Sequence, residues 1–199
     1  MKLYYAPGAC SIASRISLHE AGVEAEFERV DLKSKIAEHG GDFNTINPAG
    51  SVPMLVLDDG TAVTENVAVL DLIAERAPQL GVEGPLGRTR LIEMLSYLST
   101  ELHIAFKPFW HSASESEKAK AGEAVTRRLA FLESRMLGDY LFGARFTVAD
   151  AYLFAMLRWA KGFGLPLSPR LLGYFERIAA REAVGRSLAE EMPHAKAMS

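Results

Sequence analysis

The stretch KLYYAPGACSIASRISLHEAG, residues 2–22, decides the fold. Lys2 to Tyr5 is a short run of β-prone residues that Pro7-Gly8 interrupts. Apolar residues at helical spacing then run from Ser11 to Ala21 and are followed by Gly22, a common residue just past a helix end. The sequence therefore predicts a strand followed directly by a helix.

Three further β-prone runs follow this unit. Phe27 to Leu32 alternates apolar and polar residues at the period of a half-buried strand. Val52 to Leu57 is a compact apolar run, and a turn at Asp58-Asp59-Gly60 joins it to a run at Thr61 to Thr64, which predicts a hairpin. Because a helix connects the first two strands, we expect them to pair in parallel with a right-handed crossover.

The chain divides at one linker. Pro78 to Gly87 holds three glycines and two prolines. Before it, Lys33 to Ile46 is a polar, less regular segment and Glu65 to Arg76 is an amphipathic helix, which completes the order β-α-β-(α)-β-β-α. We therefore expect an α/β domain over residues 1–77, the linker over 78–87 and an all-helical domain over 88–199.

Apolar residues recur at helical spacing after the linker. One run extends from Leu91 to Phe106 and is stopped by Pro108, and a second extends from Val125 to Met136. Thr147 and Asp150 form a capping-box pattern just before the apolar run AYLFAML, residues 151–157, which predicts a central, buried helix. Two amphipathic segments follow, at residues 170–181 and 183–191.

Composition excludes several classes of protein. The chain has 199 residues, 49% of them hydrophobic and 24% charged, which is typical of a soluble globular protein. The net charge is −3, and no long block of one sign favours nucleic acid or an anionic membrane as a partner. The longest apolar run is far short of the ~20 residues that span a bilayer, and we expect no secretion signal. The histidines are scattered and lack a second cysteine, so we expect no metal site.

Cys10, the single cysteine, follows the first strand where the helix begins. It cannot form an internal disulfide, which favours a reducing cytoplasm. Exposed N–H groups and the dipole at a helix start favour a thiolate, so we expect a lowered pKa, with the Ser11 hydroxyl able to donate a hydrogen bond to a sulfur anion. The alternative is that Cys10 is a small buried apolar residue.

Two further patterns suit a peptide-like ligand. A proline within an apolar run, at Val52-Pro53, indicates a sheet edge or a strand end, and a cis bond there would leave the Val52 backbone free to pair with an extended ligand. Glu65 and Asn66 open a helix directly after a strand. Glu65 either binds the ammonium group of a ligand or interacts only with the helix dipole.

Together these patterns resemble the cytosolic glutathione transferases. The string MKLYYAPGACSIASRISLHEAG, with NPAGSVPMLVLDDG, STELH and FTVAD, is similar to the bacterial beta class along essentially the whole chain. The resemblance implies a thioredoxin-like N-terminal domain, an all-α C-terminal domain and a cis Val52-Pro53 bond. It also implies a dimer with active sites beside the subunit interface and no permanently bound cofactor.

The resemblance further implies roles for individual residues. Cys10, Ser11 and His103 would lie near the reacting sulfur, and Cys10 could form a mixed disulfide with glutathione. Glutathione would be bound by Tyr5, Lys35, Val52, Pro53, Glu65, Asn66, Ser96 and Thr100. The chain departs from the class where Ile104 replaces a lysine that often follows the histidine, and where Ser96 replaces an asparagine. We therefore expect weaker thiolate stabilisation from this helix.

Side chains of the helical domain allow two interpretations. Ser96, Ser99, Thr100 and His103 are three or four residues apart, which predicts one polar stripe that is either solvated or lines the glutathione cleft. Phe106, Phe109, Trp110 and Trp159 either wall a pocket for a second, apolar substrate or belong to the core.

The expected activity is the conjugation of reduced glutathione to a small hydrophobic electrophile. Alternatives are a glutaredoxin-like thiol–disulfide oxidoreductase or a glutathione-dependent peroxidase using Cys10, and a glutathione-dependent dehalogenase or isomerase. A non-enzymatic carrier of apolar ligands is the alternative from another class.

Overall fold

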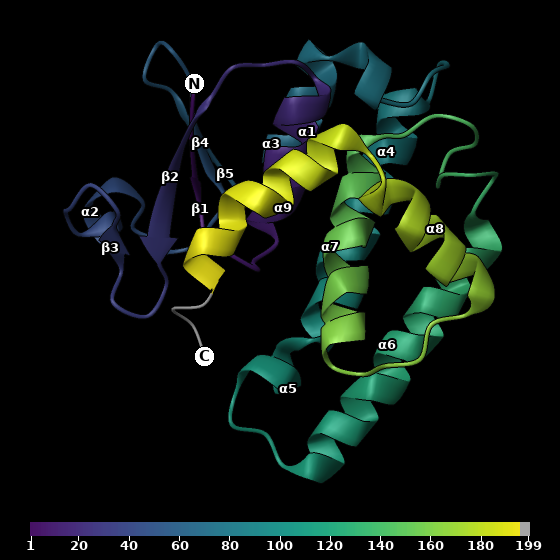
Figure 1. Ribbon diagram of the computed structural model, residues 1–199. Coiled ribbons are helices and arrows are strands. Elements are labelled where there is room, and N and C mark those ends of the chain that lie inside the picture. Colours follow the sequence, from purple (N-terminus) through teal and green to yellow (C-terminus); the bar gives the residue numbers. More distant parts are fainter. Residues whose placement is uncertain (196–199) are drawn as a thin grey trace.

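A sheet-containing part and a helical part lie side by side in the computed structural model, which describes the backbone of residues 1–195 and the side chains of residues 1–191 (Figure 1). The first part contains β1 (Lys2–Tyr5), α1 (Ser11–Glu20), β2 (Glu26–Asp31), β3 (Ile36–Ala37), α2 (Phe43–Ile46), β4 (Met54–Val56), β5 (Ala62–Thr64) and α3 (Asn66–Arg76). The second contains a 3₁₀ turn (Pro78–Leu80), α4 (Gly87–Tyr97), a π-helical turn (Leu98–His103), α5 (Lys107–Trp110), α6 (Glu115–Arg135), α7 (Val148–Gly162), α8 (Pro169–Ala179) and α9 (Glu182–Ala195).

The sheet has the strand order β3-β2-β1-β4-β5. β1 and β2 are parallel and connected by α1, as predicted, and Leu3 of β1 lies opposite Phe27 of β2. β4 and β5 form the predicted antiparallel hairpin. The segment Lys33–Ile46 holds the short strand β3 as well as the four-residue helix α2, so the sheet has one strand more than the sequence predicted.

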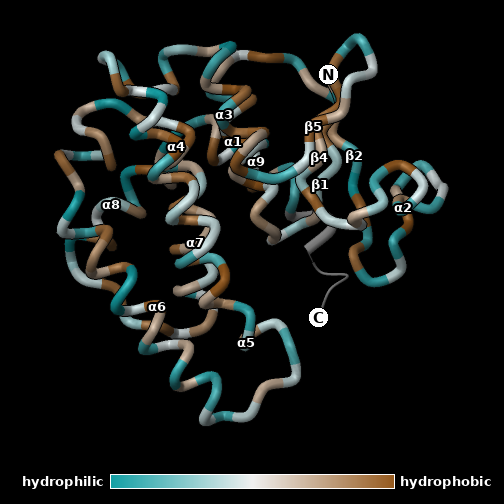
Figure 2. The backbone as a smooth tube through the Cα atoms, turned by 180° about the vertical axis from the view of Figure 1, so that it is seen from behind, coloured by the Kyte–Doolittle hydropathy of each residue, from teal (hydrophilic) through white to brown (hydrophobic). Residues whose placement is uncertain are grey.

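The two faces of the sheet are covered differently. On the α2 side, Tyr4, Val30, Phe43 and Met54 form a small separate core. On the other side, α1 and α3 pack against the sheet and also against α7, so that the principal core is continuous between the two parts (Figure 2). The first strand–helix junction is therefore held from both parts of the molecule.

Asp150 organises the start of α7. Its carboxylate accepts hydrogen bonds from the Thr147 N–H at 2.8 Å and the Thr147 hydroxyl at 2.7 Å, which confirms the predicted cap. The same carboxylate accepts from the Leu141 N–H at 2.8 Å and the Tyr174 hydroxyl at 2.7 Å. α7 is buried nearly all round, as its apolar sequence predicted.

The long run from Leu91 to Phe106 is not one regular α-helix. α4 ends at Tyr97, and Leu98–His103 winds as a π-helical turn. Such turns use i→i+5 hydrogen bonds and are frequent at functional sites. The run ends at Phe106, as predicted, and Pro108 lies in the first turn of the following helix α5, where a proline costs no hydrogen bond.

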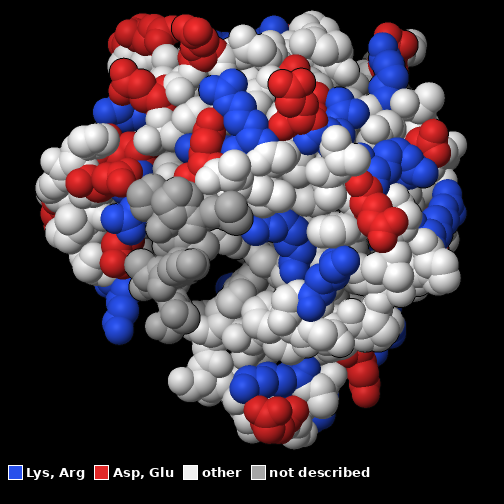
Figure 3. Space-filling view, viewed as in Figure 1, with Lys and Arg blue, Asp and Glu red and all other residues white. Residues whose placement is uncertain are grey.

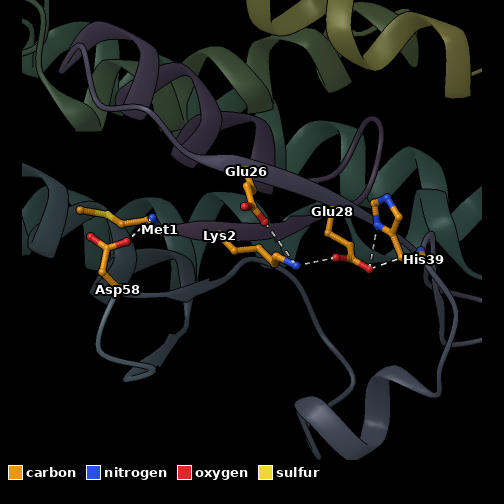
Figure 4. Close-up of polar contacts among 6 residues, drawn as sticks. All are labelled: Met1, Lys2, Glu26, Glu28, His39 and Asp58. Atoms are coloured by element: carbon orange, nitrogen blue, oxygen red, sulfur yellow. Dashed lines mark hydrogen bonds and ion pairs between the residues drawn. The ribbon is translucent and has the colours of Figure 1, made fainter.

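An acidic side chain fixes the other end of the sheet (Figure 4). Glu28 of β2 is buried and accepts hydrogen bonds from the Lys2 ammonium at 3.0 Å and the His39 N–H at 3.3 Å. The exposed Glu26 lies 3.5 Å from the same ammonium group. These contacts join β1, β2 and the loop after β3.

Candidate active site between the two domains

Cys10 lies at the start of α1, where the sequence placed it. It is half-buried, and its S–H donates a weak hydrogen bond of 3.7 Å to the carbonyl of Val52. The Val52–Pro53 peptide is cis, as the resemblance implied. The thiol and the residue before β4 therefore meet at one point, although they are distant in sequence.

The expected lowering of the Cys10 pKa is wrong in direction. Burial raises the pKa of this thiol to about 12, and the charge of Glu65 adds to the increase. The backbone N–H groups of Cys10 and Ser11 act in the opposite direction but do not offset the loss of water. The Cys10 sulfur is therefore a neutral thiol at neutral pH.

Ser11 and Tyr5 both contact the structure around the β1–α1 connection. Ser11 is fully buried, and its hydroxyl donates to the Ala6 carbonyl at 3.3 Å and accepts from the Ala6 N–H at 3.2 Å. Tyr5 is only 2% exposed and packs under the Arg15 guanidinium, 4.2 Å from the ring centroid. Both residues stabilise the β1–α1 connection, which the sequence pattern could not distinguish from ligand binding.

Glu65 and Asn66 meet at the start of α3 and face different surroundings. Glu65 is exposed and has a left-handed backbone with φ of 68°, a conformation that costs a non-glycine residue about 1–2 kcal/mol. Asn66 is buried, and its Oδ1 accepts from the Ser14 hydroxyl at 2.9 Å. Its Nδ2 has no hydrogen-bond partner among the described residues. A buried donor is thus available beside the exposed carboxylate.

Lys35 fixes the loop that leads to Val52. Its ammonium donates to the Gly50 carbonyl at 2.7 Å. Gly50 has a positive φ of 59°, and a side chain there would collide with Asn44. Lys35 is half-buried, so part of its side chain still faces solvent.

The predicted polar stripe is divided, because Thr100 and His103 face different surroundings. Thr100 is exposed, its hydroxyl donates to the Ser96 carbonyl at 2.9 Å, and it lines a groove against α6. His103 instead points into the domain and contacts α7. The reason is the π-helical turn, which changes the angle between successive residues from that of an α-helix. Among the described residues, no contact joins Thr100 to Cys10, Glu65 or Asn66.

An aromatic cluster surrounds His103. The ring centroids of Trp159 and Trp110 lie 4.9 and 5.6 Å from the imidazole centroid. Phe106 is fully buried beneath them, so its predicted place in a pocket wall is wrong, whereas Phe109, Trp110 and Trp159 keep exposed surface. Burial, with a smaller contribution from Lys107, lowers the pKa of His103 to about 4, which leaves the imidazole neutral.

Three polar contacts of this site escaped the sequence analysis. The Trp159 indole N–H donates to the Gly8 carbonyl at 2.8 Å, and the buried Glu191 carboxylate accepts from the Gly8 N–H at 3.1 Å. The Tyr152 hydroxyl lies 2.8 Å from Nδ1 of His103. A hydroxyl within an otherwise apolar helix was the one signal that could have pointed to Tyr152.

Comparisons with known proteins decide the family. A sequence model described as the glutathione S-transferase N-terminal domain matches residues 9–76, and one for the C-terminal domain matches residues 97–182. The chain is 38% identical over 198 residues to glutathione S-transferase GstA of Escherichia coli O157:H7, covering 96% of this chain and 98% of that protein. The chain belongs to the glutathione S-transferase family.

Solved structures of glutathione S-transferases share the fold. A sphingomonad enzyme complexed with glutathione has a TM-score of 0.91 and 44% identity, covering 96% of this chain and 99% of that one. A bacterial beta class enzyme of Sphingomonas chungbukensis has a TM-score of 0.90 and 43% identity, covering 96% of this chain and 98% of that one. The predicted fold class and the resemblance to this family are both confirmed.

Two further properties concern the described part of the chain. None of the helices within it combines the length and apolar character that crossing a bilayer requires. Histidine, cysteine and acidic side chains within it do not gather into a group of three that could hold a metal ion.

On the face shown in Figure 3, basic and acidic side chains are interspersed, and the surface is hollowed between the two parts of the molecule.

Proposed function

We propose that this glutathione S-transferase conjugates reduced glutathione to small hydrophobic electrophiles. Glutathione would bind at Val52, Glu65 and Asn66, with its sulfur beside Cys10. The glutathione thiol loses its proton to solvent, and the thiolate then attacks the electrophilic carbon. A carbon–sulfur bond forms, and either a leaving group departs or a strained ring or double bond opens.

The observation that carries this proposal is the position of Cys10, whose S–H is bonded to the Val52 carbonyl beside the cis Val52–Pro53 peptide. Because burial raises the pKa of its thiol to about 12, Cys10 is a poor nucleophile at neutral pH. This favours conjugation, in which glutathione supplies the reacting sulfur, over the alternatives that use a Cys10 thiolate. The Cys10 thiol remains able to donate a hydrogen bond to the bound sulfur.

The remaining groups would complete the two subsites. The exposed Glu65 carboxylate suits the ammonium group of the γ-glutamyl end, and the buried, unpartnered Nδ2 of Asn66 suits an oxygen of the peptide. Lys35 suits a carboxylate at the other end of the peptide. Trp110 and Trp159 would form the wall for the apolar second substrate, where Trp110 is 41% exposed.

We further infer a homodimer that uses α4 and α6. Phe131 is 46% exposed on α6, and Tyr97 of α4 packs 5.0 Å from its ring. A second copy of the chain would cover this apolar surface. The Arg128–Glu101 ion pair beside the neighbouring groove would flank the contact.

An unpaired cysteine also favours a reducing location such as the cytoplasm.

The test compares wild type with Cys10→Ala. Wild type should bind glutathione by calorimetry and conjugate at least one member of a panel of aryl halides, epoxides and enals. Cys10→Ala should retain most of this activity. If the variant loses all turnover while disulfide or peroxide reduction by wild type is fast, the oxidoreductase alternative is correct. Binding of apolar ligands without turnover, unaffected by glutathione, would instead support the carrier.

A further inference from the structure

The hydroxyl of Tyr152 is a buried polar group that the proposed reaction does not yet use. Tyr152 lies on α7 and is 1% exposed, and its oxygen is 2.8 Å from Nδ1 of His103. The neighbouring residues on this helix, from Ala149 to Leu157, are buried and apolar apart from Asp150, which caps the helix start. A polar atom inside such a helix needs a partner, and His103 is that partner.

Groups from both domains surround this hydroxyl. The side chains of Ser99 of the π-helical turn and of Asn66 of α3 lie near it, and Cys10 and Glu65 also interact with it electrostatically. On the His103 side, Lys107 of α5 is the charged group, and the rings of Trp110 and Trp159 cover the imidazole. Tyr152 therefore lies where the candidate glutathione residues of the two domains converge.

The surroundings of the Tyr152 hydroxyl determine which partner donates in the Tyr152–His103 hydrogen bond. Burial raises the pKa of the Tyr152 hydroxyl, so the phenol keeps its proton, and the His103 imidazole is neutral. A neutral imidazole carries one ring proton, on Nδ1 or on Nε2. Among the described residues, Nδ1 of His103 is the atom within hydrogen-bond distance that can accept the phenol proton, so the phenol donates to Nδ1. The ring proton of His103 is then on Nε2.

We propose that Tyr152 is a positioning residue that holds His103 as the Nε2–H tautomer, so that the imidazole meets the glutathione sulfur as a neutral hydrogen-bond donor. The imidazole is next to the loop before Cys10, because it packs on Trp159 and the Trp159 N–H is bonded to Gly8. A neutral donor would partly replace the positive charge that Ile104 does not supply. The role of this tautomer in catalysis rests on the proposed glutathione chemistry. The tautomer itself follows from the Tyr152–His103 contact alone.

The first experiment determines the tautomer directly. The ¹⁵N resonances of the His103 ring distinguish Nε2–H from Nδ1–H. Wild type should show a single Nε2–H tautomer, and Tyr152→Phe, which keeps the packing and removes the oxygen, should show a mixture. A wild-type Nδ1–H tautomer would overturn the inference whether or not the protein binds glutathione, so its failure is separate from failure of the proposed function.

The second experiment measures the pKa of the bound glutathione thiol, from its thiolate absorbance and from the pH profile of kcat/KM. In Tyr152→Phe the pKa of the bound glutathione thiol should rise by about one unit. At pH values below this pKa, kcat/KM should fall by about tenfold, while the KM for glutathione should change little. Tyr140→Phe is the matched control, since Tyr140 is buried and its hydroxyl accepts a hydrogen bond from Arg181 away from the site. Its pH profile should equal that of wild type.

A double-mutant cycle separates positioning from packing. His103→Gln keeps a donor near the place of Nε2 but has no Nδ1 to be oriented. In that background, Tyr152→Phe should leave the pKa of the bound thiol and kcat/KM unchanged. An equal loss in both backgrounds, or an unshifted profile in a folded Tyr152→Phe single variant, would show that Tyr152 only packs.

Discussion

The indole N–H of Trp159 donates a 2.8 Å hydrogen bond to the carbonyl of Gly8, which joins α7 of the helical domain to the loop just before Cys10. The N–H of the same Gly8 is bonded to the Glu191 carboxylate of α9. Both backbone groups of one glycine are thus held by side chains from the other domain. The position of the Cys10 loop depends on how the two domains pack.

Replacing Trp159 by Phe should loosen this loop. The ring packing is largely retained, while the Gly8 carbonyl loses its donor, so we expect a loss of about 1 kcal/mol in the free energy of unfolding and a severalfold lower kcat/KM. Urea unfolding and conjugation assays measure the two effects. Trp110→Phe is the control for the unfolding measurement, because the Trp110 indole N–H has no hydrogen bond among the described residues. Equal losses in both variants would contradict a role for the Gly8 bond.

The alkylation rate of Cys10 should show that the site raises the pKa of its thiol. Without glutathione, iodoacetamide should modify Cys10 more than tenfold more slowly at pH 7 than it modifies a free thiol, because the thiolate fraction is small. The rate should still be rising at pH 9. Glu65→Gln should speed the reaction, since the Glu65 charge contributes to the raised pKa. A plateau below pH 7 would show a thiolate and restore the oxidoreductase alternative.

The two helix caps should differ strongly in their effect on stability. Asp150→Ala leaves four donors of three residues without their acceptor in the core, so we expect a loss of about 3 kcal/mol or more in the free energy of unfolding. Ser114→Ala removes the exposed cap of α6 and should cost about 1 kcal/mol. Urea midpoints of the two variants give the comparison, and similar shifts would contradict the central role of Asp150.

Glu28 should make stability fall in acid. Burial by itself would raise the pKa of its carboxyl, but the Lys2 ammonium and the His39 N–H outweigh burial and lower it. Because the folded pKa is below the unfolded value of about 4.3, the contribution is complete above that pH and is lost as pH falls through the folded pKa. Glu28→Gln should flatten this part of the curve of urea midpoint against pH. Glu26→Gln removes an exposed carboxylate near the same lysine, and the curve of urea midpoint against pH for this variant should have nearly the slope of wild type.

The proposed dimer surface can be tested with one charge. Phe131→Lys would place an ammonium group in the apolar contact, so the variant should elute as a monomer with an unchanged circular dichroism spectrum. Ile46→Lys is the control, because Ile46 is an exposed apolar residue on α2, in the sheet-containing part of the molecule. Light scattering gives the masses. If the Phe131→Lys variant remains a dimer, the subunit interface does not include Phe131.

The sequence predicted the strands and helices well, because their periods and caps are local. Leu3, Leu55 and the Thr147–Asp150 cap needed only neighbouring residues to be placed correctly. The π-helical turn at Leu98–His103 was missed because its apolar spacing equals that of an α-helix.

Errors within the site came from burial, which is not a local property. A cysteine at a helix start predicted a lowered pKa, yet segments far along the chain remove water from Cys10 and reverse the shift. Phe106 was placed in the pocket wall because helical spacing does not distinguish a core ring from an exposed one. Tyr152 was missed for the same reason, since its hydroxyl is meaningful only once His103 is known to face it.

The π-helical turn has a consequence for how this chain tolerates changes in length. A π-helical turn takes one residue more than an α-helix to wind through a similar angle. Loss of one residue there, such as Glu101, would let an α-helix replace the turn without rotating the helices that follow it relative to α4. We therefore expect this turn to tolerate a one-residue deletion better than the regular helices on either side of it, where the same deletion would rotate the following residues by about 100°.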